Sequence, residues 1–197
     1  MSSLNEFLSY VSYSPKVEMN DIIKVTNEFN DTNTDVDAAR IKLAEMMPVA
    51  YSGSVDSVIW KLFTPSISLS DVDKELEDYS CFAFPALRAL EGYLKYLLAL
   101  KEIIIDENHN FGSVFKKDPE DGIKRIVIPK YVISIADNDF IEALESIYNY
   151  FIQNRHVLFR VDQIFINTKV IEDKHEAITI INDVAAMIES TYKKAVK

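Results

Sequence analysis

Residues 82–104 read FAFPALRALEGYLKYLLALKEII and form the most hydrophobic stretch of the chain. Pro85 stands near its beginning, where the missing backbone N–H of a proline costs a helix least. Leucines recur at intervals of three and four, which is the spacing of one helix face and differs from the alternation of a strand. These residues, which predict a core helix, are Leu87, Leu90, Leu94, Leu97 and Leu98.

Two later segments show the same periodicity. Asp137 can cap a helix that runs to about Gln153. Its apolar stripe consists of Phe140, Ile141, Leu144, Ile147, Tyr148 and Phe151. The segment Lys174–Tyr192 has a similar stripe and is followed by lysines, which are favourable beside the negative end of the helix dipole. We expect the three long helices to pack together.

The rest of the chain predicts shorter elements. Helical spacing occurs in residues 18–29, 35–47, 55–63 and 70–77, and Pro48 is expected to end the second of these helices. Residues 36, 39, 43 and 46 would form the inner face of that helix: Val36, Ala39, Leu43 and Met46. Residues 118–122 are a turn signal, and residues 125–128 predict a short strand or a buried loop.

Composition agrees with a helical fold. The 197 residues are 48% hydrophobic and include only 4 glycines and 6 prolines, which leaves little room for a turn-rich β fold. The expected fold class is all-α, a helical bundle with a small irregular or β insertion. We expect a helical domain over residues 49–197, and residues 1–48 as an N-terminal helical extension of unknown role.

Charge and residue usage exclude several classes of function. The net charge of −10 opposes contact with polyphosphate, so a role in RNA binding would need a local cluster of cations. Cys81 is the single cysteine and the three histidines are far apart, so neither a disulfide nor a zinc site is expected. No nucleotide-binding motif is present, and no cofactor is predicted. The lack of a signal peptide or a membrane-spanning segment predicts a cytoplasmic protein without membrane contact.

Two short runs carry the candidate chemistry. Residues 154–162 read NRHVLFRVD, with two arginines and a histidine close together in an acidic chain. Arg88 and Glu91 are three residues apart and so share a face of the core helix. On composition alone, an ordinary surface ion pair and two solvated arginines would explain these residues.

Both runs resemble one family. The run FPALRALEG at residues 84–92 is similar to a helix of the RNase LS toxin family, a member of the HEPN superfamily of ribonucleases. The run RHVLFRVD at residues 155–162 resembles the family's RHxLFHVD segment, which has the superfamily's Arg-x4-His layout. Order and spacing agree over about residues 50–192. The resemblance implies a HEPN-like bundle.

The resemblance also implies a function. Family members are metal-independent endoribonucleases of toxin–antitoxin or anti-phage systems, in which the 2′-hydroxyl attacks the adjacent phosphate. The expected partners are an RNA substrate, a cognate antitoxin protein and a second copy of the chain, because HEPN ribonucleases form a composite groove as homodimers. By position, Arg155 is the motif arginine, and Arg88 and Glu91 complete the site, with Glu91 orienting an arginine.

Arg160 departs from the pattern, because it occupies the position of the catalytic histidine. Arginine stays protonated at biological pH, so it keeps the positive charge and loses the proton transfer. We therefore expect a form with little or no catalytic activity. Such a change is expected both of an enzyme disabled so that cells tolerate it and of a decayed natural copy. His156 is adjacent, but on a helix it would point roughly 100° away from Arg155.

Two other functions fit parts of the sequence. Arg160 favours a non-catalytic HEPN-like module that dimerises or binds a partner. A HEPN partner of a nucleotidyltransferase antitoxin is less consistent, because such toxins continue the motif with x-Tyr, whereas Val161 and Asp162 follow here.

Overall fold

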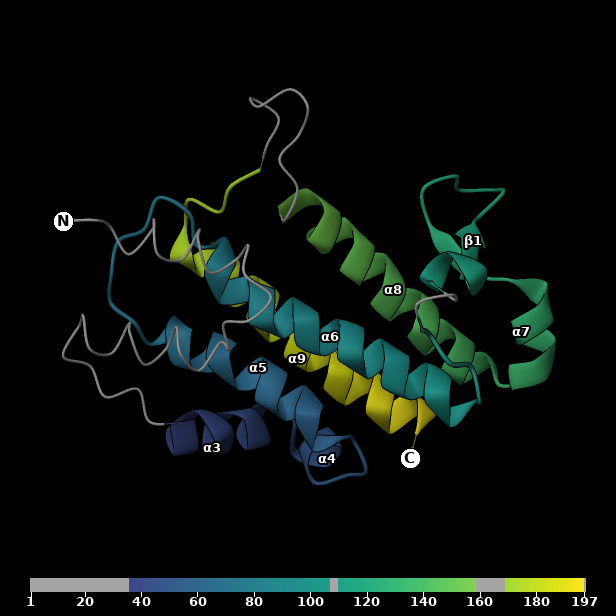
Figure 1. Ribbon diagram of the computed structural model, residues 1–197, viewed down its shortest axis with the longest axis horizontal. Helices are drawn as coiled ribbons and strands as arrows, with labels where there is room; N and C mark the ends of the chain where they lie inside the picture. The colour runs from purple at the N-terminus through teal and green to yellow at the C-terminus, as the bar shows by residue number, and fades with distance from the viewer. Residues whose placement is uncertain (1–35, 107–109, 159–168, 197) are drawn as a thin grey trace.

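The computed structural model describes residues 36–106, 110–158 and 169–196, and Figure 1 shows this part of the chain as a bundle of helices. Its β structure is one small two-stranded sheet. The predicted all-α class with a small insertion is confirmed. In these ranges no helix is both long and apolar enough to cross a lipid bilayer.

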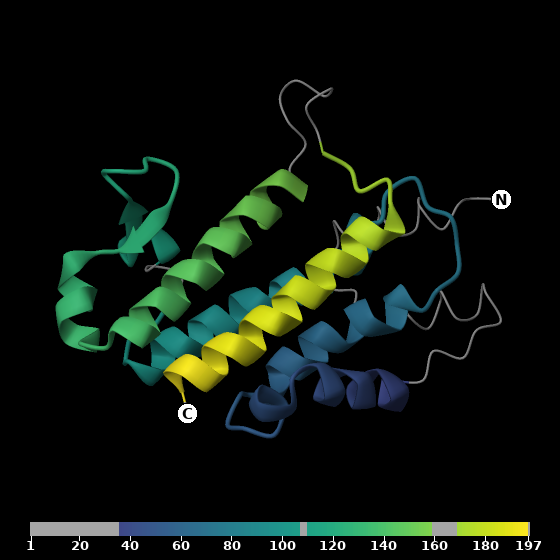
Figure 2. The same ribbon diagram turned by 180° about the vertical axis from the view of Figure 1, so that it is seen from behind.

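The predicted core helix lies at the centre of the bundle. It is α6 (Ser80–Leu100), and it contacts α5 (Ser57–Ser70), α8 (Asn138–Leu158) and α9 (Lys174–Ala195). Figures 1 and 2 show α6 beside α9 from both sides, with α5 and α8 on opposite flanks. All of the predicted core leucines are buried: Leu87, Leu90, Leu94, Leu97 and Leu98. The three long helices therefore pack together as expected.

Two short helices extend the bundle along α5 and α9. They are α3 (Val36–Met46) and α4 (Pro48–Tyr51). The first N–H groups of α4 donate to the carboxylate of Glu189 on α9, at 3.2 Å from Val49 N and 2.9 Å from Ala50 N. This buried carboxylate joins the N-terminal helices to the last one, because it satisfies donors that a helix start leaves without intrahelical partners.

The insertion between α6 and α8 is a hairpin with two flanking helical turns. Its elements are η1 (Phe111–Ser113), β1 (Phe115–Lys117), β2 (Arg125–Val127) and α7 (Pro129–Ile135). The side-chain amide of Asn149 on α8 pairs with β2, accepting from Arg125 N at 2.7 Å and donating to Arg125 O at 2.8 Å. The Phe115 ring stacks on Tyr148 with centroids 4.0 Å apart. These contacts fix the hairpin to α8.

The structure corrects two helix boundaries. Val55–Phe63 and Ser70–Glu77 were expected as separate helices, but α5 runs unbroken to Ser70 and residues 72–76 are irregular. In that irregular segment the Tyr79 hydroxyl accepts from Leu76 N at 3.1 Å. Helix α8 continues past Gln153 to Leu158, so Arg155 belongs to its last turn. Val36, expected to face inward, is 37% exposed. Residues 18–29 lie outside the described ranges.

Pro85 also differs from the expectation. It is an interior residue of α6, because the helix begins at Ser80. A proline there removes one ladder hydrogen bond, and its ring clashes with a carbonyl of the preceding turn. The hydroxyl of Ser66 on α5 lies at this point, donating to Phe82 O at 2.7 Å and accepting from Ala86 N at 2.8 Å. A side chain of the neighbouring helix thus satisfies the backbone of α6 beside the proline.

Candidate functional site

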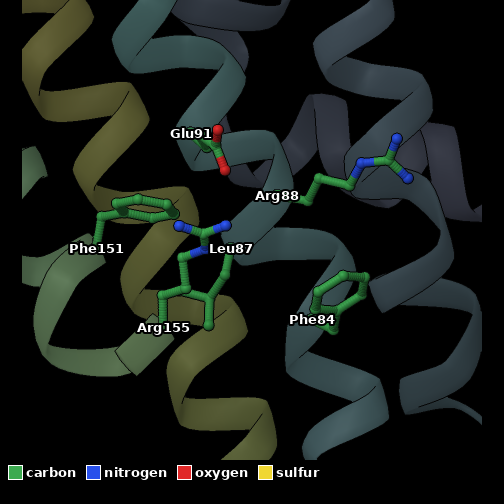
Figure 3. Close-up of a pocket in the computed structure, with 6 residues that line it drawn as sticks. All are labelled: Phe84, Leu87, Arg88, Glu91, Phe151 and Arg155. Carbon is green, nitrogen blue, oxygen red and sulfur yellow. The ribbon is translucent and has the colours of Figure 1, made fainter. Parts of the chain in front are cut away.

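The predicted site residues of α6 and α8 meet at one pocket. It has a volume of about 170 Å³ and is lined by Phe84, Leu87, Arg88, Glu91, Phe151 and Arg155. Figure 3 shows these side chains, four from α6 and two from α8. The lining of the pocket therefore combines three apolar side chains with three charged ones.

Arg155 is held on the α8 side of the pocket by an aromatic ring. Its guanidinium carbon lies 5.3 Å from the centroid of Phe151, one helical turn earlier. A cation over a ring face is attracted by the ring quadrupole, and the contact restricts where the guanidinium can lie. The Phe151 ring is itself buried, so this support is part of the core.

Glu91 faces Arg155 from the α6 side. In Figure 3 the Glu91 carboxylate and the Arg155 guanidinium point toward one another. The Glu91 side chain is 25% exposed, and its Oε1 atom lies 3.0 Å from Nζ of Lys95, one turn along α6. A half-buried carboxylate between cations is suited to orienting an arginine, which is the role that the family resemblance gives it.

Arg88 lines the same pocket but is exposed. Figure 3 shows its side chain extending away from Glu91 and Arg155. Three of the four predicted residues are thus brought to one pocket, with two of them facing each other. Arg160 lies outside the described residues, so the complete four-residue site stays a prediction.

Sequence reasoning missed three apolar lining residues and Lys95. Phe84, Leu87 and Phe151 line the pocket, although the helical spacing of Leu87 and Phe151 predicted only core packing. The sequence held a signal for Phe151 and for Lys95: Phe151 precedes Arg155 by four residues, and Lys95 follows Glu91 by four. Side chains at that spacing are neighbours on a helix surface.

The chemistry of the pocket follows from its lining. Two arginines supply positive charge for a phosphate group, and arginine's planar fork matches phosphate oxygens. Among the described lining residues, Glu91 is the one whose side chain can accept a proton, because arginine stays protonated. In the described ranges no group of three His, Cys, Asp or Glu side chains could hold a metal ion.

The geometry defines a helical domain with a cationic pocket between α6 and α8, and comparison with known proteins identifies its family. The family model described as "RNase LS, bacterial toxin DBD domain" matches residues 35–162, which is more than half of the chain. The chain therefore belongs to the RNase LS toxin family.

A curated relative and a solved structure extend this match. The chain is 28% identical over 197 residues to the mRNA endoribonuclease LsoA of Escherichia coli O157:H7, covering 95% of this chain and 51% of the relative. It thus spans about half the length of that protein. The crystal structure of Escherichia coli toxin LsoA in complex with T4 phage antitoxin Dmd superposes with a TM-score of 0.75 at 26% identity. That match covers 98% of this chain and 71% of the solved one.

Proposed function

We propose that this chain is part of an endoribonuclease toxin of a toxin–antitoxin or anti-phage system, with catalysis impaired by Arg160. The observation that carries the proposal is the shared pocket of Arg88, Glu91 and Arg155. Arg88 and Arg155 are far apart in the sequence, yet both line this pocket, and the family resemblance leads us to expect them in one site. The relative's name, an mRNA endoribonuclease, supports RNA as the substrate.

The proposed reaction needs no cofactor. The 2′-oxygen of a ribose forms a bond to the adjacent phosphorus while the bond from phosphorus to the 5′-oxygen breaks. A base takes the proton of the 2′-hydroxyl, and an acid gives a proton to the leaving 5′-oxygen. The products are a 2′,3′-cyclic phosphate and a free 5′-hydroxyl. Negative charge grows on the phosphate oxygens, and Arg155 stabilises it through paired hydrogen bonds.

Arg160 removes one part of this reaction. A histidine at this position would transfer the proton, since its pKa lies near neutrality. An arginine retains the attraction for phosphate but neither accepts nor releases the proton. Loss of general acid–base catalysis typically costs about 10²–10⁴-fold in rate. The chain with Arg160 is therefore expected to bind RNA weakly and cleave it slowly or not at all.

The proposed partners are an antitoxin protein and a second copy of the chain. The solved LsoA structure contains the phage antitoxin Dmd, which supports an antitoxin partner for this family member. Homodimerisation follows from the HEPN resemblance, and it would double the local positive charge of a chain with net charge −10. Light scattering at micromolar concentration tests homodimerisation, and we expect a dimer. An Arg160→His variant that is monomeric and still cleaves RNA would contradict it. We also propose that the toxin acts in the cytoplasm.

The test of the proposed function is the Arg160→His variant. Purified variant and unaltered chain are incubated with the same RNA, and the initial cleavage rates are compared with and without EDTA. We expect a rise of about 10²–10⁴-fold that EDTA does not reduce. Vigorous cleavage by the unaltered chain, unaffected by His156→Ala, would contradict the assignment.

The second candidate is a non-catalytic HEPN-like module that binds a partner, and Arg160 is the observation that favours it. Expression in bacteria separates the two functions. Growth arrest by Arg160→His supports the toxin, whereas harmless expression of a soluble Arg160→His protein supports the module.

A further inference from the structure

A continuous set of contacts joins Lys95 to Arg155 around the pocket. Nζ of Lys95 lies 3.0 Å from Oε1 of Glu91 and 5.9 Å from the ring centroid of Phe111. The Phe111 ring meets the Phe151 ring at a centroid distance of 6.1 Å and an interplanar angle of 64°. Phe151 in turn supports Arg155 at 5.3 Å. Two cations are thus held at the two ends of one aromatic pair, one of them bonded to Glu91.

Glu91 is placed between these cations. Its carboxylate is bonded to Lys95 on its own helix and points toward Arg155 across the pocket. A carboxylate that paired fully with a guanidinium would occupy the same planar fork that binds two phosphate oxygens. The position of Glu91 therefore determines how much of the Arg155 guanidinium is available to an anion.

We propose that Lys95 is a positioning residue that holds Glu91 back from Arg155, so that the guanidinium fork stays open to a phosphate of the RNA backbone. Lys95 acts through Glu91 and does not line the pocket itself. The inference rests on the proposed function in one respect, which is that RNA supplies the phosphate. It requires no catalysis, and the chain with Arg160 is suitable for testing it.

Single and double variants of Lys95 and Glu91 are expected to differ in RNA affinity in a defined direction. With Lys95→Met, Glu91 loses its partner and pairs with Arg155, and RNA binding weakens by about two- to fivefold, the range expected for a partly exposed ion pair. With Glu91→Gln already present, no carboxylate competes, so Lys95→Met has little further effect. If the two charge deletions acted independently, their changes in the free energy of RNA binding would instead add.

The experiment is a double-mutant cycle on the full chain. The probe is a short fluorescent RNA with 2′-O-methyl riboses, which cannot be cleaved by 2′-oxygen attack, and binding is followed by anisotropy at low salt. Lys95→Arg keeps the ion pair and should bind like the unaltered chain. Lys101→Met is the matched control: it also removes one lysine, at the C-terminal cap of the same helix, and a cation–π contact, 4.5 Å from Phe140. Arg155→Ala reports whether the pocket binds the probe.

The proposal is supported if Lys95→Met weakens binding well beyond Lys101→Met, and if Glu91→Gln removes that excess. It is overturned if the two effects add, if Lys95→Arg behaves as Lys95→Met, or if Arg155→Ala leaves binding unchanged. Failure of the proposed function is separate: it appears as absence of cleavage by Arg160→His, and it leaves the result of the binding cycle intact.

Discussion

Replacement of Ser66 by alanine tests how α6 tolerates its internal proline. The Ser66 hydroxyl is fully buried and bonded to both Phe82 O and Ala86 N, which are backbone groups of two buried residues. In Ser66→Ala the donor Ala86 N and the acceptor Phe82 O both lose the hydroxyl as a partner. An unsatisfied buried polar group costs about 1–3 kcal/mol. If Phe82 O and Ala86 N move closer and bond directly in the variant, some of this free energy is recovered. We expect a loss of about 2 kcal/mol in the free energy of unfolding.

The chain offers a matched control two residues along the same helix. Ser68 is 3% exposed, and among the described residues its hydroxyl has no hydrogen-bond partner. Ser68→Ala removes the same atom from a similar environment but breaks no hydrogen bond, so the free energy of unfolding should stay constant or rise. The difference between the two variants isolates the bridge to α6, because the cavity and the change in helix propensity are nearly the same.

Urea unfolding followed by circular dichroism measures both variants against the unaltered chain. A loss of about 2 kcal/mol corresponds to roughly 4–8 °C in Tm for a chain of this size. Equal stability of Ser66→Ala and Ser68→Ala would refute the reasoning, since it would mean that the hydroxyl bridge contributes nothing. A lower m-value for Ser66→Ala alone would mean that the compactness of its folded or unfolded state has changed, or that its unfolding is no longer two-state, and the two free energies of unfolding could then not be compared.

Three further variants test the packing of α6 and α9 against their neighbours. A Cβ on Gly53 would clash with the hydroxyl of buried Tyr192, so Gly53→Ala should lower the free energy of unfolding by about 1–3 kcal/mol. Gly92→Ala, with its nearest neighbour atom at 3.6 Å, should raise it by about 0.5–1 kcal/mol. Burial acts to raise the pKa of Glu189, but hydrogen bonds from Lys193, Ala50 N and Val49 N together outweigh it and hold the pKa below its usual value. That stabilisation is present above the unfolded pKa of about 4.3 and is lost as pH falls through the folded pKa, so Glu189→Gln should destabilise at pH 7 and converge with the unaltered chain in acid.

The long helices could be predicted from the sequence, because burial imposes a spacing of three and four on apolar residues. The leucines of α6 follow this rule. The start of α8 could be predicted from its capping residue, and the Asp137 carboxylate accepts from Phe140 N at 3.1 Å as expected. The end of α8 could not be predicted in this way, since its last turn begins with the charged residue Arg155, which the Phe151 ring supports. The length of α6 depends on a contact from another helix, the Ser66 hydroxyl, which periodicity does not record.

The candidate site was predictable in part. The spacing of Arg88 and Glu91 placed them on one helix, and the family resemblance placed Arg155 with them, as the shared pocket now does. The direction of the Arg88 side chain, away from Arg155, and the contact of Lys95 with Phe111 depend on tertiary packing. No local pattern in the sequence carries that information.

The central claim is that RNA cleavage needs Arg155 together with a histidine at position 160, and one measurement tests it most directly. The rate of RNA cleavage and the chemistry of the product ends are determined for Arg160→His with Arg155 intact, and with Arg155→Ala or Arg155→Lys added. The proposal predicts cyclic phosphate ends for Arg160→His, loss of cleavage with Arg155→Ala, and partial recovery with Arg155→Lys, because a point charge cannot form the planar fork. Cleavage by Arg160→His that persists unchanged with Arg155→Ala would contradict it.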